Sequence, residues 1–346
     1  MTLLRPRSET AQACLALAIA AAGAIVASLV HFPAPYLTGP AIAVTAAGLM
    51  GARLAVPGRL ADVAMILIGM SIGAGVTPGV LDTARQWPAS FVLLAFSLLA
   101  IMIVSSYWLR RHFAYDRKTA LLASSPGHLS YVLSLSTDTN ADIRQIGLVQ
   151  SIRVLALTLI VPVVVSAMGG EIDPDQGPAA AMSVLSIALT FILSILVGLV
   201  LKRFRLPAAL LVGGMIVSTV SHLTGTIEGV MPLWLQIPAF LIMGALIGSR
   251  FGGVTLAMLR SAFSAGIAIT VIASVLAAAF ALLVAGLFDL PTGQLLIAFM
   301  PGGVEAMIAI AVLLDADPTF VAAHHVMRLF ILTALVPIML GRRRTS

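Results

Sequence analysis

The sequence predicts an all-α polytopic membrane protein built from two inverted repeats, and three observations lead to that fold class. Hydrophobic residues make up 60% of the 346 residues and charged residues only 10%, whereas a soluble domain carries roughly 25% charged residues. Long apolar segments suit helices of about 20 residues that cross a bilayer. One stretch of the first half recurs in the second half, and the basic residues gather at particular segment ends.

The apolar segments form two matching sets of six. In the first half they lie near 11–30, 36–51, 60–76, 88–109, 118–136 and 145–168. In the second half they lie near 182–201, 207–221, 233–249, 262–288, 293–313 and 320–340. The first segment is longer than the 7–15-residue core of a signal peptide, so we interpret it as a retained helix. We expect one integral membrane domain made of the repeats 1–175 and 176–346.

The duplication is clearest around a Pro-Gly pair. At a fixed offset of 175 residues, and with no gap, segment 126–162 is identical to its counterpart at nine of 37 positions. The identical pairs are Pro126 and Pro301, Gly127 and Gly302, Ala141 and Ala316, Asp142 and Asp317, Arg153 and Arg328, Leu157 and Leu332, Thr158 and Thr333, Val161 and Val336, and Pro162 and Pro337. Such self-similarity is a fold-level signal.

The lysine and arginine residues favour five crossings per repeat. Of the 20 basic residues, 18 remain when Arg153 and Arg328 are set aside as intramembrane. With six crossings per repeat, 11 of these 18 residues would lie on one side of the membrane and seven on the other. If the fifth segment of each repeat enters and leaves on the same side, the split becomes 17 to 1, with Arg85 alone. Because basic loops prefer the cytoplasm, we expect inverted repeats with both termini cytoplasmic and Glu171–Asp175 outside.

The fifth segments carry their own signal. Pro and Gly interrupt them at Ser124–Gly127 and Met300–Gly303. Broken backbone at membrane depth occurs where it is buried in protein or lines a wet cavity, and inverted repeats with broken helices are typical of secondary transporters. The alternative is that Pro and Gly only kink two ordinary crossings. The spaced pairs Gly69/Gly73 and Gly244/Gly248 predict close helix contacts and are compatible with a homodimer.

These features resemble the AbrB family of bacterial membrane proteins. Four stretches carry the resemblance: Pro-Gly-Gly-x-Glu from Pro301, Asp-Ala-Asp-Pro ending at Pro318, His-His-x-x-Arg ending at Arg328, and the Phe-Pro-Ala-Pro-Tyr-Leu-Thr-Gly-Pro stretch at 32–40. The resemblance covers about 11–340 and implies a duplicated domain in the bacterial inner membrane. Family labels describe an AbrB-type regulator or an ammonia monooxygenase. The regulator label implies an indirect effect on gene expression, since no nucleic-acid-binding module is recognisable.

Arg153 and Arg328 lie deep in the last apolar segment of each repeat. A charge at that depth is costly and by default marks function. Because helix starts also favour anions, we expect a small anionic solute to bind here. The other expected binding residues surround the two interruptions: Pro126, Gly127, His128, Pro301, Gly302 and Gly303. The alternative is that each arginine is held in an ion pair with Glu305, Asp142 or Asp317.

Three further residues are candidates for proton coupling: Glu305, His324 and His325. Burial raises the pKa of a carboxyl group, which suits Glu305 as a proton carrier, or as a fixed partner of Arg328. The two histidines point about 100° apart on a helix, so one is expected to face a cavity and the other a neighbouring helix. His128 is a further relay candidate, although the first repeat has Ser130 where the second has Glu305.

The sequence does not favour an enzyme. No two histidines have the i,i+4 spacing of a chelating helix, and the single cysteine, Cys14, allows neither a disulfide within the chain nor a cysteine metal cluster. We therefore expect no cofactor and no metal. The main interpretation is a transporter of a small anion; a membrane sensor that affects gene expression indirectly is the alternative, and a monooxygenase is the less favoured third.

Overall fold

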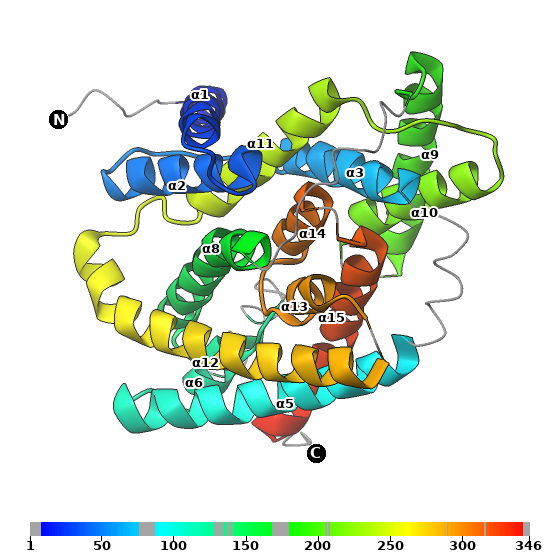
Figure 1. The fold of residues 1–346 in the computed structure, drawn as a ribbon. Helices are drawn as coiled ribbons and strands as arrows, with labels where there is room; N and C mark the ends of the chain where they lie inside the picture. The colour runs from blue at the N-terminus through cyan, green and yellow to red at the C-terminus, as the bar shows by residue number, and fades with distance from the viewer. Residues whose placement is uncertain are drawn as a thin grey trace. The chain divides into compact units, whose positions relative to one another are not determined.

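The computed structural model is all-helical in the part of the chain that it describes. It describes residues 8–75, 87–127, 132, 135, 136, 139, 141–167, 180–204, 206, 208–288, 290–314 and 316–341. The named helices, shown in Figure 1, are α1 (Glu9–Leu29), α2 (Pro35–Leu49), α3 (Gly58–Ala74), α5 (Trp87–His112), α6 (Arg117–Ser124), α8 (Ile143–Ala167), α9 (Val184–Arg203), α10 (Ala209–Leu223), α11 (Leu233–Ser249), α12 (Leu256–Phe288), α13 (Thr292–Phe299), α14 (Val304–Leu313) and α15 (Pro318–Leu340). The described residues contain one isolated bridge, between Ala181 and Val230, and no strand.

Six of these helices are long and apolar enough to cross a membrane: α1, α5, α8, α9, α12 and α15. The helices α2, α3, α10 and α11 are shorter, with 15 to 17 residues each. Each of the twelve apolar segments of the sequence contains a helix, so the all-α prediction is confirmed, and the six long apolar helices support a membrane protein. The number of crossings and the inverted orientation of the repeats stay predictions.

The two interruptions are ends of helices. Helix α6 stops at Ser124, just before Pro126. Helix α13 stops at Phe299, and α14 begins only at Val304. The residues that close α6 and α13 have nearly the same backbone angles: φ −62° and ψ 117° at Ser125, φ −58° and ψ 133° at Met300. The Pro-Gly pairs therefore end two short helices with matching geometry.

The chain forms two compact units, and each sequence repeat contributes to both. The first unit contains 1–85, 162–254 and 308–319, and the second contains 86–161, 255–307 and 320–346. The first three helices of each repeat thus belong to the first unit. Helices α6 and α13, which end at the two interruptions, belong to the second unit, whereas α14 is divided between the units.

In the first unit, helices from the two repeats cross closely at glycine residues. A β-carbon added at Gly73 in α3 would lie 2.5 Å from the carbonyl oxygen of Met215 in α10. A β-carbon at Gly248 in α11 would lie 2.9 Å from the carbonyl oxygen of Ala41 in α2. The first glycine of each pair makes the same kind of contact one turn earlier. The predicted contact role of these glycines is therefore confirmed. The glycines of α3, in the first repeat, contact α10 in the second, and those of α11, in the second repeat, contact α2 in the first.

The entries to α2 and α10 also match. Both helices begin after an alanine in the left-handed conformation, Ala34 with φ 52° and Ala208 with φ 49°. Residues other than glycine seldom adopt this conformation. The related motifs that precede these helices in the sequence, Phe-Pro-Ala and Leu-Pro-Ala, thus produce the same uncommon turn.

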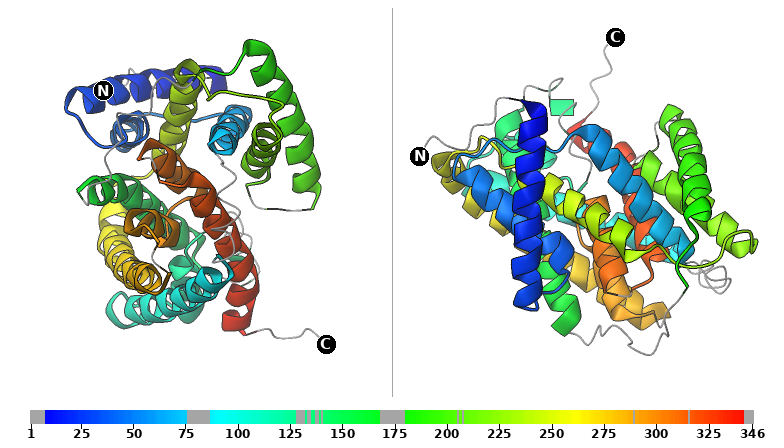
Figure 2. Two further views of the ribbon diagram at one scale, coloured as in Figure 1. Left: turned by 45° about the vertical axis from the view of Figure 1, so that its right-hand side comes forward. Right: turned by 90° about the horizontal axis from the view of Figure 1, so that it is seen from above.

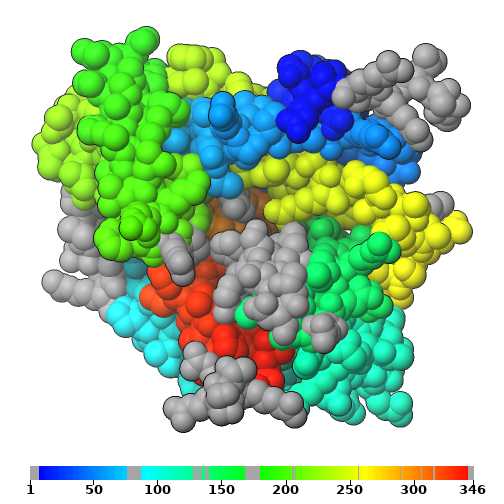
Figure 3. Space-filling model, turned by 180° about the vertical axis from the view of Figure 1, so that it is seen from behind, coloured from blue at the N-terminus to red at the C-terminus, as the bar shows by residue number. Residues whose placement is uncertain are grey.

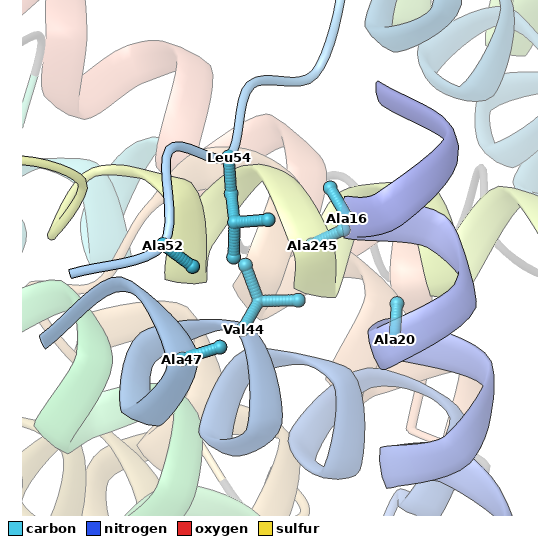
Figure 4. Packing of buried hydrophobic residues seen from close by; sticks show 7 residues of the cluster. All are labelled: Ala16, Ala20, Val44, Ala47, Ala52, Leu54 and Ala245. Atoms are coloured by element: carbon cyan, nitrogen blue, oxygen red, sulfur yellow. The ribbon is translucent and has the colours of Figure 1, made fainter. Parts of the chain in front are cut away.

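Small apolar residues fill the space between α1, α2 and α11. Helix α1 lies across α2, as both views in Figure 2 show. The buried cluster drawn in Figure 4 consists of Ala16, Ala20, Val44, Ala47, Ala52, Leu54 and Ala245. Five of the seven are alanines, so the helices are held near one another by small side chains.

The outer surface of the first unit is apolar along α9, which is green in Figure 3. Its exposed large side chains are Val184, Leu185, Leu189, Ile192, Leu193, Leu196, Leu199 and Val200. Basic residues, Lys202 and Arg203, occur only in the last turn of this helix. A surface of this kind suits a lipid environment and would be unfavourable in water.

In the second unit, α5 runs beside α12, and the short helices α6 and α13 pack against α5 and α12 respectively. Helix α8 approaches α12 at Gly266, where an added β-carbon would lie 2.8 Å from Cγ2 of Ile152. The middle of α8 lies at the first interruption, where Arg153 bonds to the carbonyl oxygen of Ser125.

Candidate functional site

Arg153 closes the first interruption. Its guanidinium Nη2 donates a hydrogen bond of 3.0 Å to the carbonyl oxygen of Ser125, the residue that ends α6. The Arg153 side chain is buried, with 1% of its surface exposed. Carbonyl groups at the end of a helix have no partner within the helix and carry partial negative charge. Arg153 therefore satisfies a backbone group that the Pro-Gly break leaves open.

Arg328 also donates to backbone carbonyls at a helix end, that of the second interruption. Its Nη1 donates to the carbonyl oxygen of Met300 at 2.8 Å, and Met300 ends α13. Its Nη2 donates to the carbonyl oxygen of Gly302 at 2.7 Å. Arg328 follows Arg153 by 175 positions, as Met300 follows Ser125. The two deep arginines and the two interruptions are thus parts of one duplicated arrangement.

Arg153 keeps unused donors. Within the described residues, its Nε and Nη1 atoms have no hydrogen-bond partner. A buried donor without an acceptor costs about 1–3 kcal/mol, and more when the group is charged. A ligand with acceptor oxygens would remove this cost.

Gln150 is a site residue that the sequence interpretation missed. It lies one turn before Arg153 on α8, and its side-chain Nε2 donates to the carbonyl oxygen of Leu122 at 2.9 Å. Gln150 is 2% exposed. The signal was present in the sequence, because a glutamine in an apolar segment needs a buried partner. Gln150 and Arg153 together hold the last turn of α6.

His325 occupies the position in the second repeat that Gln150 has in the first. Its Nδ1 lies 3.0 Å from the carbonyl oxygen of Val321, one turn earlier on the same helix. Its Nε2 has no hydrogen-bond partner among the described residues, and the side chain is fully buried. In the neutral ring, Nδ1 therefore carries the hydrogen and Nε2 offers a lone pair.

His324 faces α5, so the expectation that one of the two histidines faces a neighbouring helix fits the geometry. Its Nε2 lies 2.7 Å from Oγ of Ser90, and its Nδ1 lies 2.9 Å from the carbonyl oxygen of Phe320. Three phenyl rings lie around the imidazole, with centroids at 3.9 Å for Phe320, 4.7 Å for Phe91 and 5.9 Å for Phe299. Ser90 was not identified from the sequence.

The two repeated aspartates lie at the starts of the arginine-bearing helices. Oδ1 of Asp142 accepts the backbone N–H groups of Arg144 and Gln145, both at 3.0 Å. Oδ1 of Asp317 accepts the N–H of Thr319 at 2.9 Å. Asp142 is exposed and precedes Arg153 by 11 residues, about 16 Å along a helix. The structure thus places Asp142 and Arg153 apart.

The interruptions themselves are tightly packed. Pro126 and Pro301 are buried. Gly127 has φ +153°, and a β-carbon there would lie 2.9 Å from Cδ1 of Leu332 on α15. A β-carbon at Gly302 would lie 2.7 Å from Cε of Met307.

The carbonyl of Gly303 accepts the N–H of Met307 at 2.9 Å, which starts α14. Two predicted site groups, His128 and the side chain of Glu305, lie outside the described residues.

Helix α6 begins with a charged cap outside the long apolar helices. Oδ1 of Asp116 accepts the backbone N–H groups of Lys118 at 2.9 Å and Thr119 at 3.1 Å. Burial alone would raise the pKa of Asp116, but hydrogen bonds from Thr119 and Lys118 outweigh it and lower this pKa below its ordinary value. Burial, with a smaller contribution from the charge of Asp142, raises the pKa of the neighbouring Tyr115.

No group of three or more His, Cys, Asp or Glu side chains that could hold a metal ion lies together in the described ranges. Cys14 is a free, exposed thiol on α1. Among the described residues, the side chains of Gln150, Arg153 and Arg328 donate hydrogen bonds to backbone carbonyl oxygens of α6 and at the ends of α6 and α13.

Comparison with known proteins gives a consistent result. Residues 36–343 match the family model AbrB, described as "Transition state regulatory protein AbrB". The chain is 28% identical to "Uncharacterized protein YhjN" of Bacillus subtilis (strain 168), over 93% of this chain and 90% of that protein. It is 29% identical to "Putative regulator AbrB" of Escherichia coli (strain K12), over 87% of each chain.

Proposed function

This chain belongs to the AbrB family, and on that premise we propose that it is a secondary transporter of a small anionic solute in the bacterial inner membrane. The solute binds near the two helix interruptions, at Pro126 to His128 and Pro301 to Gly303. Arg153 and Arg328 supply positive charge there. In this proposal the protein is not an enzyme and uses no cofactor or metal.

One observation carries the proposal: Arg153 and Arg328 are buried at repeat-related helix ends, with 1% and 0% of their surfaces exposed. Burying a guanidinium is expensive in a membrane protein, and such residues mark solute pathways more often than packing. Helix interruptions are tolerated at membrane depth where they are enclosed by protein or line a cavity. The combination of both features, present twice, is typical of carriers with duplicated domains.

Proton movement is the second part of the proposal. His325, with its open Nε2, and Glu305, four residues after Pro301, are candidates to exchange a proton as the solute moves. His324 has a hydrogen-bond partner on α5 and is the candidate to tune rather than to carry the proton. A carrier of this kind would move its anion together with protons.

A membrane sensor that affects gene expression indirectly is the second candidate. The observation that favours it is the name of the Escherichia coli relative, which describes a regulator. A sensor would bind the same class of anion but would not carry it across the membrane.

A flux assay distinguishes the transporter from the sensor. The purified protein is placed in sealed liposomes, and uptake of radiolabelled acetate, lactate and succinate is followed with and without an imposed pH gradient. We expect uptake of at least one anion above that of protein-free liposomes, with a rate that depends on the gradient. Binding of an anion without any flux would contradict transport and support the sensor.

A further inference from the structure

The two arginines use their donors differently. Arg328 donates through Nη1 and Nη2 to two carbonyl oxygens, those of Met300 and Gly302. Arg153 donates only through Nη2, to Ser125, among the residues that the structure describes. The two repeats therefore differ in how many backbone carbonyls the arginine is seen to bond: one for Arg153 and two for Arg328.

The asymmetry has a local cause in the backbone after each helix end. In the second repeat, the N–H of Gly302 bonds to the carbonyl of Met300 at 2.9 Å. This tight turn brings the Gly302 carbonyl beside that of Met300, where both face Arg328. In the first repeat, Gly127 has φ +153° and packs against Leu329 and Leu332 of α15. Ser125 is then the single carbonyl that Arg153 bonds within the described residues.

The remaining donors of Arg153 still form a complete fork. A guanidinium has five N–H groups, and adjacent pairs can hold the two oxygens of a carboxylate in parallel. One N–H of Nη2 is parallel to Nε–H, and its other N–H is parallel to Nη1–H. If either N–H of Nη2 bonds to Ser125, the other still forms a parallel pair that can hold a carboxylate. Gln150 donates to the Leu122 carbonyl, so this acceptor on α6 already has a side-chain donor.

From this geometry we propose that Arg153 makes the direct contact with the ligand, and that the ligand is a monocarboxylate. Arg328 is a positioning residue that fixes the shape of the second interruption. The proposal rests on the anion transport proposed above and narrows it. A single carboxylate balances the charge of the one guanidinium that it contacts, whereas the second carboxylate of a dianion would need a partner beyond the Arg153 fork.

Thermal unfolding of the purified protein in detergent tests this, with acetate, lactate, succinate and sulfate as probes. We expect acetate or lactate to raise the Tm by at least about 2 °C near saturation. The rise should be lost in Arg153→Lys and Arg153→Gln, because lysine lacks the planar fork. Arg328→Lys should lower the Tm of the ligand-free protein and keep the rise. The control Arg144→Lys, on the exposed start of α8, should change neither the Tm of the ligand-free protein nor its rise with acetate or lactate.

A second measurement keeps Arg153 unchanged, in case the Arg153 variants do not fold. In protein labelled with 15N-arginine, acetate should shift one buried Nε–H signal that persists in Arg328→Lys. A rise in Tm that survives in Arg153→Lys but is lost in Arg328→Lys would overturn this inference and leave anion transport intact. A response to succinate or sulfate alone would refute the monocarboxylate assignment. No response to any probe, from a protein that unfolds cooperatively, would contradict the anion site altogether.

Discussion

Gly73 and Met215 meet backbone to backbone, so that a β-carbon at Gly73 would lie 2.5 Å from the Met215 carbonyl oxygen. Real β-carbons do not approach other atoms this closely. Gly248 stands in the same relation to α2. In a lipid environment helices associate mainly through such close packing. The stability of the first unit should therefore depend on these glycines.

Replacement of Gly73 or Gly248 by leucine should reduce the yield of folded protein and lower its Tm. Overpacking of this kind costs about 1–3 kcal/mol or more. Size-exclusion chromatography and thermal unfolding in detergent would measure the effect. Gly286→Leu is the matched control, because Gly286 is an exposed helical glycine on α12 with no atom within 4 Å of an added β-carbon. Unchanged yield and Tm for both variants would leave these glycines without a packing role.

The pair of Ser90 and His324 should show strong energetic coupling. Ser90→Ala leaves the buried Nε2 of His324 without its partner at 2.7 Å, which should cost about 1–3 kcal/mol. His324→Phe alone strands the Ser90 hydroxyl less severely, because it also bonds to the Trp87 carbonyl at 2.8 Å. The double variant Ser90→Ala with His324→Phe should lose less stability than the sum of the single losses. Additive losses in this double-mutant cycle would show that the pair is not coupled.

Asp116 should contribute to stability in a pH-dependent way. Its pKa in the folded protein lies below the ordinary value of an aspartate, so the folded state favours the charged carboxylate. The contribution is complete above the unfolded pKa and is lost as the pH falls through the lower folded value. The Tm difference between the natural protein and Asp116→Asn should therefore shrink as the pH falls through the acid range in which Asp116 takes up its proton.

Asp116→Ala also removes the cap of α6 and should cost about 1 kcal/mol more than the asparagine variant at neutral pH. A Tm difference for Asp116→Asn that stays constant from neutral pH into acid would rule out a role for the charge.

The predicted topology rests on the split of basic residues between the two sides of the membrane, and reporter fusions test it. Reporter fusions at either terminus should be cytoplasmic, and an epitope inserted between Glu171 and Asp175 should be accessible from outside the cell. All three points lie beyond the described residues, so the test uses intact cells. An epitope in that linker that is accessible only after the cells are opened would eliminate the inverted arrangement.

Much of the fold could be predicted because it depends on residue type and spacing. The twelve apolar segments, the ends of α6 and α13 and the glycine contacts are each specified by local chemistry: hydrophobicity, a missing amide hydrogen at Pro126 and Pro301, and a missing side chain at Gly73 and Gly248. The depth of Arg153 and Arg328 follows from their place within apolar segments. These properties can be recognised without knowledge of which helices pack together.

The partners of the polar groups could not be predicted in the same way. The acceptors considered for the arginines were carboxylates, whereas those of Arg153 and Arg328 include the carbonyls of Ser125, Met300 and Gly302. Every residue has a carbonyl, so residue type does not show which one a helix end leaves unsatisfied. The contact of Ser90 with His324 spans 234 positions of the chain and depends on how α5 packs against α15.

The composition of the two units has a consequence for biosynthesis. Each unit takes helices from both repeats, and the chain passes from one unit to the other within three helices: α8, at 161–162, α14, at 307–308, and α15, at 319–320. When the ribosome has completed the first 175 residues, neither unit has all its helices. Helix α3, with Gly69 and Gly73, still lacks α10, and α2 still lacks α11, which carries Gly244 and Gly248. The first half must therefore wait in the membrane, incompletely assembled, until the second half is inserted. Its short helices are then the segments most dependent on rapid completion of the chain.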